Sequence, residues 1–182
     1  MKLLSGLCFL FLSVACFAQK NSAEKEWDDF IKDFEAKQKA AIGKPYPEFS
    51  IVGGDSIISN KSWKGKTVFI NFWFEACSPC IAEFDGLNQL YNKVKDNKNI
   101  VFISFTFETT KKIEEIKAKY KIQYPAVSIT EKESRRLNLN NGFPTNIIVD
   151  KEGKIKFLVT GGSTDKVKAS EIIMKEIYPK IL

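Results

Sequence analysis

Histidine is absent from all 182 residues of this sequence. Histidine is the base of Ser-His-Asp and Cys-His catalytic groups, and it is the commonest protein ligand for zinc and copper. Its absence excludes both kinds of catalytic site. It also removes the side chain on which most zinc and copper sites depend.

Cysteine is scarce, with only four residues in the chain. Cys8 and Cys16 lie in an apolar N-terminal segment, which leaves Cys77 and Cys80 as one closely spaced pair. A disulfide between these cysteines would close only a very short loop. It would therefore add little to stability. A disulfide-scaffold protein is therefore excluded. The pair is either a small structural disulfide, two buried thiols or a reactive site.

Long apolar runs are missing except at the N-terminus. The segment Leu3–Phe17 follows the positive charge of Lys2 and ends abruptly in polar chain. At about fifteen residues it is too short to span a bilayer comfortably, and it is typical of a signal-peptide core. The small residues Cys16 and Ala18 favour cleavage after Ala18. Residues 1–18 are therefore predicted to be a signal peptide of an exported, periplasmic protein.

Two alternatives for this segment stay open. In a membrane-tethered lipoprotein, Cys16 would carry a lipid anchor, although such signals usually have an aliphatic residue where Ser13 stands. A buried N-terminal helix is the other alternative, but a helix this apolar needs more core than the chain offers. No later segment approaches the length of a membrane span.

The net charge of +6 gives no sign of nucleic-acid binding. The lysines of segments 93–98 and 117–121 alternate with acidic and apolar residues, which is typical of solvated helix faces. No nucleic-acid partner is expected.

Residues 19–42 are predicted to form an N-terminal amphipathic helix. Within it, Trp27, Phe30, Ile31 and Phe34 have helical spacing and make one apolar stripe. Packing of the stripe on the chain's own domain is favoured, and binding of a partner is the alternative.

The remaining residues, 43–182, alternate between strand and helix patterns. The segment 49–59 predicts a hairpin that turns at 53–55, and a short helix or loop is expected at 131–139. Strands are predicted at 67–74, 100–107, 124–129, 145–149 and 154–160, and helices at 80–94, 111–120 and 166–177. This order predicts an α/β domain with a central mixed sheet flanked by helices.

The cysteine pair lies where a buried strand ends and a helix begins. Unpaired backbone N–H groups and the helix dipole favour a negative charge there, so Cys77 is expected to be a reactive thiolate. Pro79 suits the first helical turn because its missing N–H costs nothing there. Cys77 is predicted to attack a disulfide, and Cys80 to resolve the mixed disulfide.

The surrounding residues resemble a known family. The segment 71–83 (NFWFEACSPCIAE) is similar to the active-site strand and helix of thioredoxin-like proteins, and more narrowly to their exported TlpA/ResA branch. The segments 43–49 and 64–66 extend this resemblance. A second motif, 142–145 (GFPT), resembles the one that holds a cis-proline opposite the cysteines. The resemblance covers residues 41–182.

This resemblance implies a thioredoxin-like fold, with the N-terminal helix and the hairpin as additions. It also implies a thiol–disulfide oxidoreductase that needs no cofactor and no metal, with Cys77 and Cys80 as its redox-active disulfide. The substrate-binding residues it implies are Phe143, Pro144, Ser78 and Pro79. The partners would be disulfide-bearing client proteins and an upstream thiol electron donor.

Three positions depart from the family pattern. Ala76 replaces a tryptophan before the first cysteine, and Asn71 replaces an aspartate that accepts a proton in thioredoxins. Asp85-Gly86 stands where the family has a helix-kinking proline, so a weaker bend is expected at Gly86.

The sequence also predicts the surroundings of other side chains near the motif. Phe72 and Trp73 are expected in the core. Glu75 and Glu108 are candidates for proton transfer, whereas Glu83 is expected to be a solvated or capping residue of the helix.

The absence of histidine between the cysteines favours a reductant of exported proteins, for example in cytochrome c maturation. A thiol peroxidase is one alternative, but Ile70 and Phe74 stand where its Pro and Thr/Ser would be. A Cu(I) chaperone holding the metal between two thiolates is another, and such proteins generally add a distant histidine.

Overall fold

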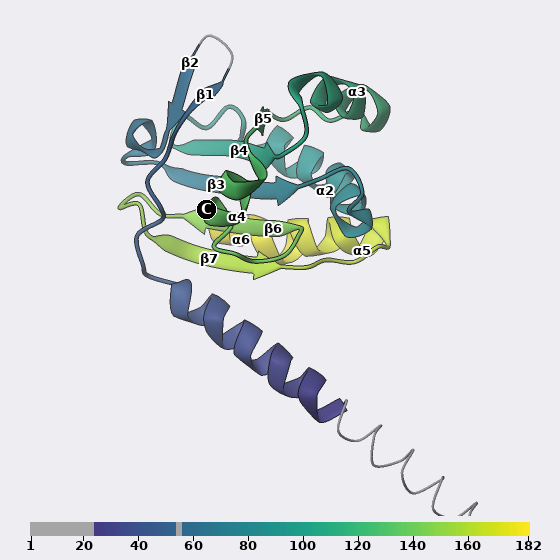
Figure 1. Cartoon of the computed structure of the whole chain (residues 1–182). Helices are drawn as coiled ribbons and strands as arrows, with labels where there is room; N and C mark the ends of the chain where they lie inside the picture. Colours follow the sequence, from purple (N-terminus) through teal and green to yellow (C-terminus); the bar gives the residue numbers. More distant parts are fainter. Residues whose placement is uncertain (1–23, 54–55) are drawn as a thin grey trace, which may run out of the picture. The chain divides into compact units, whose positions relative to one another are not determined.

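The computed structural model describes residues 24–53 and 56–182 (Figure 1). The predicted signal peptide and the tip of the hairpin at 54–55 lie outside these residues. The chain divides into two units, with the boundary between residues 40 and 41, and each is described by itself. Within the described part of the chain, no helix combines the length and the apolarity that crossing a bilayer requires.

The predicted N-terminal helix is present over residues 24–41. Its aromatic side chains stack along one side, with ring centroids 5.6 Å apart for Trp27 and Phe30 and 6.1 Å apart for Phe30 and Phe34. Trp27 and Phe30 are exposed. The amphipathic stripe is therefore formed as expected, and its packing on a domain or a partner stays a prediction.

The second unit is built on a five-stranded mixed sheet, in the order β5-β4-β3-β6-β7. The central strand β3 (Thr67–Trp73) pairs in parallel with β4 (Ile100–Thr106) and antiparallel with β6 (Thr145–Val149). Outside them lie β5 (Ala126–Ser128), parallel to β4, and β7 (Ile155–Thr160), antiparallel to β6. The run of β-branched and aromatic residues in β3 is buried throughout, as a strand covered on both faces requires.

Helices cover both faces of the sheet. They are α2 (Ser78–Val94), α3 (Thr110–Tyr120), α4 (Glu131–Leu137), α5 (Lys166–Glu171), the π-helical η2 (Ile172–Ile177) and α6 (Tyr178–Ile181). Alternate residues of β3 point to opposite faces. Phe69 and Trp73 share a core cluster with α2, η2 and α6, whereas Ile70 and Phe72 share one with Leu137 of α4.

A separate hairpin, β1 (Ser50–Gly53) with β2 (Ser56–Ser59), precedes the sheet and leads into the short 3-10 helix η1 (Asn60–Trp63). The architecture is the predicted α/β thioredoxin-like fold with an added helix and hairpin. Phe72 and Trp73 are fully buried, as expected.

Some boundaries differ from the prediction. The strand expected at 124–129 spans only Ala126–Ser128, because Pro125 has no N–H to give to a ladder. The segment expected at 131–139 as helix or loop is a helix that ends at Leu137, and Leu139 and Asn140 then adopt left-handed backbone conformations. The closing helical segment continues past residue 177 to Ile181.

Gly86 of α2 packs closely against α5 and η2. A Cβ atom built on Gly86 would lie 2.8 Å from the Cα atom of Ser170 and 3.2 Å from two atoms of Ile173. Because Ser170 Cα belongs to the backbone, it cannot rotate away. The glycine therefore allows the helix contact, which the expectation of a weak bend did not anticipate.

We predict that Gly86→Ala destabilises the protein. Alanine improves helix propensity by about 1 kcal/mol. Because the clash is with a backbone atom at 2.8 Å, the overpacking cost should lie in the upper part of the range of about 1–3 kcal/mol. The free energy of unfolding should therefore fall by about 1–2 kcal/mol. Urea denaturation followed by circular dichroism measures this. Gly142→Ala is the control, because its Cβ would meet only Thr160 Cγ2 at 3.5 Å. Equal stability of the two variants would contradict the prediction.

Candidate redox-active site

The two cysteines form a disulfide at the start of α2, with their Cα atoms 5.2 Å apart. Cys77 is the N-cap residue, and the backbone N–H of Cys80 donates to its sulfur at 3.3 Å. Ser78 and Pro79 form the first helical turn. The structure thus places the pair at the strand–helix junction that the sequence predicts, where the helix favours a thiolate.

Both cysteine residues are buried. Cys77 is 5% exposed and Cys80 only 1%. The neighbours Ala76 and Ser78 are exposed on either side of Cys77. A partner protein would therefore have to approach the disulfide from the side of these exposed neighbours of Cys77.

The second predicted motif lies beside the disulfide. The Phe143–Pro144 peptide bond is cis, and Pro144 directly precedes β6. Thr145 pairs with Phe72 of β3, so Pro144 lies next to the end of the strand that leads into the cysteines. Thr145 Oγ1 donates to the carbonyl of Gly142 at 2.6 Å, which fixes the loop before the proline.

An aromatic cluster lines this region. The ring centroid of Phe143 lies 5.3 Å from that of Phe74 and 5.8 Å from that of Phe107. Phe74 and Phe107 themselves stack at 5.3 Å. All three side chains are half-buried, and they come from three neighbouring segments at one end of the sheet. They supply an apolar surface beside the proline motif.

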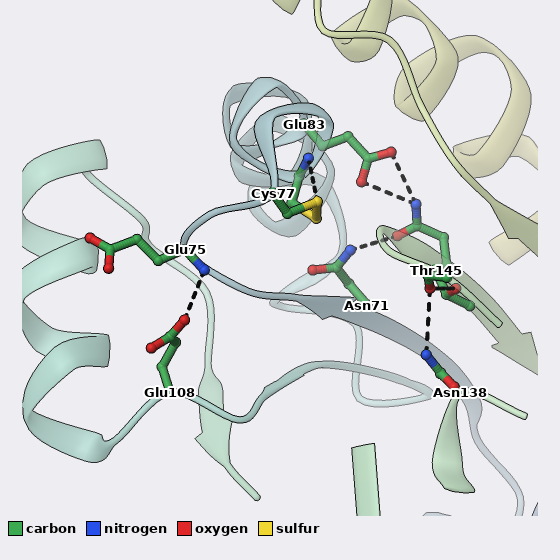
Figure 2. Close-up of a disulfide and its surroundings, with 10 residues drawn as sticks. Asn71, Glu75, Cys77, Glu83, Glu108, Asn138 and Thr145 are labelled. Atoms are coloured by element: carbon green, nitrogen blue, oxygen red, sulfur yellow. Dashed lines mark hydrogen bonds between the residues drawn. A yellow bond between two sulfur atoms is a disulfide. The ribbon is translucent and has the colours of Figure 1, made fainter. Parts of the chain in front are cut away.

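The two acidic candidates for proton transfer have structural partners instead. Glu108 Oε1 accepts the backbone N–H of Glu75 at 2.9 Å, and the Glu75 carboxylate pairs with Lys112 at 2.9 Å. Figure 2 shows the Glu75 carboxylate pointing away from the disulfide. These contacts tie the loop before Cys77 to α3, and they do not favour a role for either side chain in proton transfer.

Glu83 is the functional candidate that the sequence interpretation missed. It was expected to be a solvated or capping residue of the helix, but the residue is only 2% exposed. It lies one helical turn after Cys80, and its two carboxyl oxygens accept from Asn146 Nδ2 at 3.2 and 3.3 Å (Figure 2). Burial raises the pKa of Glu83 to about 8, while the hydrogen bond from Asn146 lowers it. A carboxyl with such a pKa can exchange protons near neutral pH.

A signal for this position was present in the sequence. Cys80, Glu83, Leu87 and Leu90 are spaced i, i+3, i+7 and i+10, and all four are buried. This spacing places Glu83 on the inward stripe of α2. The expectation of a solvated residue followed from its charge, because glutamate is rarely buried.

Asn71 of β3 belongs to the same buried chain of hydrogen bonds as Asn146 and Glu83. It is 1% exposed, and its Nδ2 donates to Asn146 Oδ1 at 2.9 Å. Its own Oδ1 has no hydrogen-bond partner among the described residues. As the sequence predicts, an amide at this place cannot accept a proton as a carboxylate does, so the buried acid of the site comes from the helix.

A disulfide at a helix N-terminus beside a cis-proline defines a thioredoxin-like redox protein. The chain belongs to the AhpC/TSA family, which matches residues 42–158.

Individual relatives agree with this class. The thiol-disulfide oxidoreductase ResA of Bacillus thuringiensis (strain Al Hakam) is 31% identical over 148 residues, which cover 80% of this chain and 84% of ResA. The thiol:disulfide interchange protein DsbE of Haemophilus influenzae is 29% identical over 183 residues, which cover 96% of this chain and 93% of DsbE.

A solved structure is also similar. The thioredoxin domain of a thiol-disulfide oxidoreductase from Bacteroides vulgatus has a TM-score of 0.58 and 25% identity, and the match covers 73% of this chain and 98% of that domain. The expected enzyme class, a thiol–disulfide oxidoreductase, is confirmed by these relatives and by the fold.

The buried carboxyl of Glu83 predicts a pH dependence of stability. Between pH 4.5 and about 8 the folded protein keeps a proton that the unfolded chain has lost. The free energy of unfolding should therefore fall as pH rises through this window, by up to about 1.4 kcal/mol per pH unit. Glu83→Gln should remove this contribution, so its stability relative to wild type should rise from pH 5 to pH 8.

Urea denaturation of the oxidised proteins across this range measures the difference. Glu176→Gln, which changes an exposed acid, is the matched control and should follow wild type. Parallel curves for wild type and Glu83→Gln would show that Glu83 does not titrate in this window.

Proposed function

We propose that this protein is an extracytoplasmic reductase of disulfides in exported client proteins, which works by dithiol–disulfide exchange. The observation that carries the proposal is the Cys77–Cys80 disulfide at the N-terminus of α2, beside the cis bond of Phe143–Pro144. The relatives named ResA and DsbE support exchange chemistry. The apolar segment 1–18 supports export, with lipidation at Cys16 as the alternative.

The exchange begins with the reduced enzyme. The Cys77 thiolate attacks one sulfur of a client disulfide, and the other client sulfur leaves as a thiolate that takes up a proton. Cys80 then loses its proton and attacks Cys77 Sγ in the mixed disulfide. This step releases the second client thiol and closes the enzyme's own disulfide. An upstream thiol donor must return two electrons and two protons to the enzyme.

The proton of Cys80 needs an acceptor in a site that excludes water. Glu83 is the buried acid nearest to Cys80 along the inward stripe of α2, and its raised pKa suits this transfer. Asn71 has no acidic group to offer, so Glu83 is our candidate for both the acceptance and the later return of the proton.

The client is expected to bind across the exposed rim of the disulfide. Phe143 and Pro144 would align an extended client segment, as the family resemblance implies, and Ser78 and Pro79 would border it on the helix side. The half-buried rings of Phe74, Phe107 and Phe143 favour apolar client side chains beside the reacting cysteine. A cytochrome c precursor in its oxidised form is one client of this kind.

A thiol peroxidase has no support from the site. Ile70 is fully buried within β3, and Phe74 belongs to the aromatic cluster, so neither provides the polar group that would orient a peroxide.

We expect Cys80→Ser to trap clients as mixed disulfides on Cys77. The variant can make the first attack but cannot resolve the product, so trapped adducts should accumulate in cells and disappear on reduction. Non-reducing gel electrophoresis followed by mass spectrometry identifies them. Cys77→Ser is the matched control and should trap few. Equal trapping by both variants would contradict the assignment of Cys77 as the attacking cysteine.

A second measurement tests the direction of electron flow. We expect the reduction potential of the Cys77–Cys80 pair to lie nearer to thioredoxin, at about −270 mV, than to strongly oxidising members of the fold, at about −120 mV. Equilibration with glutathione or dithiothreitol buffers measures it. A potential near the oxidising limit would rule out the reductase assignment and leave the exchange chemistry intact.

A further inference from the structure

We propose that Asn146 is a positioning residue for the exchange reaction, which holds the Glu83 carboxyl against the sheet behind the Cys77–Cys80 disulfide. This inference rests on the proposed proton transfer by Glu83, and it assigns a role to a residue that does not touch the sulfurs.

The geometry begins with the sheet. Asn146 of β6 lies directly opposite Asn71 of β3 in the antiparallel register, and both side chains are 1% exposed. By strand alternation, Asn71 points to the same face as Phe69 and Trp73, which is the face that α2 covers. Two amides are therefore placed side by side beneath the helix that carries the cysteines.

Asn146 uses both ends of its amide. Its Oδ1 accepts from Asn71 Nδ2 at 2.9 Å, and its Nδ2 donates to both carboxyl oxygens of Glu83 at 3.2 and 3.3 Å. The bond from Asn71 fixes the amide orientation, so that an N–H donor and not an oxygen faces Glu83. Figure 2 shows these contacts as a continuous chain from Asn71 to Glu83.

The space around the carboxyl is closed on its other side. A Cβ atom on Gly162 would lie 3.0 Å from Glu83 Oε1 and 3.4 Å from Pro144 Cγ. The carboxyl is therefore packed between Asn146 and the chain that follows β7, close to the cis-proline. It has little room to move, which keeps it one turn from Cys80.

The hydrogen bond from Asn146 affects the pKa of Glu83. A buried carboxylate is unfavourable, and a donated hydrogen bond favours its charged form. The influences on the pKa of Glu83 are burial, which raises it, and the Asn146 bond, which lowers it. Besides the two cysteines of the reduced protein, Tyr124 is a buried titratable group here, and burial, with smaller effects of Glu83 and Asp85, keeps its phenol neutral.

The consequence for the reaction concerns one proton. When Cys80 resolves the mixed disulfide, its S–H proton passes to the Glu83 carboxylate, and the new Cys80 thiolate attacks Cys77 Sγ. Without the donor of Asn146, a smaller fraction of Glu83 would be ionised at neutral pH. The resolution step would then need a higher pH to reach the same rate.

The test uses Asn146→Leu, with Asn146→Ser as a second, smaller replacement in case the leucine variant does not fold. Carboxyl ¹³C NMR of the reduced protein follows the titration of Glu83, assigned by its loss in Glu83→Gln. We expect the midpoint to rise by about one pH unit when the amide is removed. Circular dichroism verifies that each variant is folded.

A kinetic measurement follows the resolution step directly. Reduced protein is mixed with 5,5′-dithiobis(2-nitrobenzoic acid), and the second release of thionitrobenzoate reports the attack of Cys80 on Cys77 Sγ. In Asn146→Leu the pH profile of this release should shift upward with the titration midpoint. Below the midpoint, this makes the step about tenfold slower at a given pH.

Asn88→Leu is the matched structural control. Asn88 is also a buried asparagine with two hydrogen bonds, to the carbonyl of Lys121 at 3.0 Å and from the N–H of Gln123 at 2.9 Å, and it lies on α2. This variant should lose stability without moving the midpoint or the profile. A shift as large as that of Asn146→Leu would overturn the specific role of Asn146.

Two further outcomes separate this inference from the proposed function. An unchanged Glu83 midpoint in folded Asn146→Leu and Asn146→Ser would overturn the role of Asn146 alone. A resolution profile that Glu83→Gln leaves unchanged would overturn proton transfer by Glu83, and the role of Asn146 in exchange with it.

Discussion

The antiparallel pairing of β3 with β6 is the contact on which the site depends. It sets Thr145 opposite Phe72, which brings the cis-proline beside the end of the strand that leads into the cysteines. It also sets Asn146 opposite Asn71, one residue further from the site. A slip of β6 by one residue would turn Asn146 to the other face of the sheet and leave Glu83 without its donor.

Burial of the Glu83 carboxyl is the energetically unfavourable part of this arrangement. Glu83 lies beside a core cluster of apolar and aromatic side chains, where a carboxylate without hydrogen-bond donors would be strongly unfavourable. Its raised pKa lets it remain protonated at little cost, and the amide of Asn146 makes ionisation accessible when a proton must be taken up. In the proposed reaction, the same balance that lowers stability at higher pH would provide a proton acceptor near neutral pH.

Much of the fold followed from local patterns. The buried strands β3, β4 and β6 and the helix α2 were predicted close to their observed bounds, because long runs of β-branched residues and a regular helical stripe are strong local signals. The boundaries at Pro125 and beyond residue 177 were less accurate, since backbone donors and tertiary packing decide where such elements end. The role of Gly86 was missed because it depends on Ser170, which lies far away in the sequence.

The sequence by itself determined the cysteine pair, its place at the start of a helix and the proline motif, because each is encoded within a few adjacent residues. Only the tertiary structure decided which acid serves the site. The three acidic residues Glu75, Glu83 and Glu108 are alike in a sequence, but folding pairs Glu75 with Lys112 and buries Glu83 against Asn146. A side chain's proton affinity depends on burial and on its partners, and both are set by residues distant in the chain.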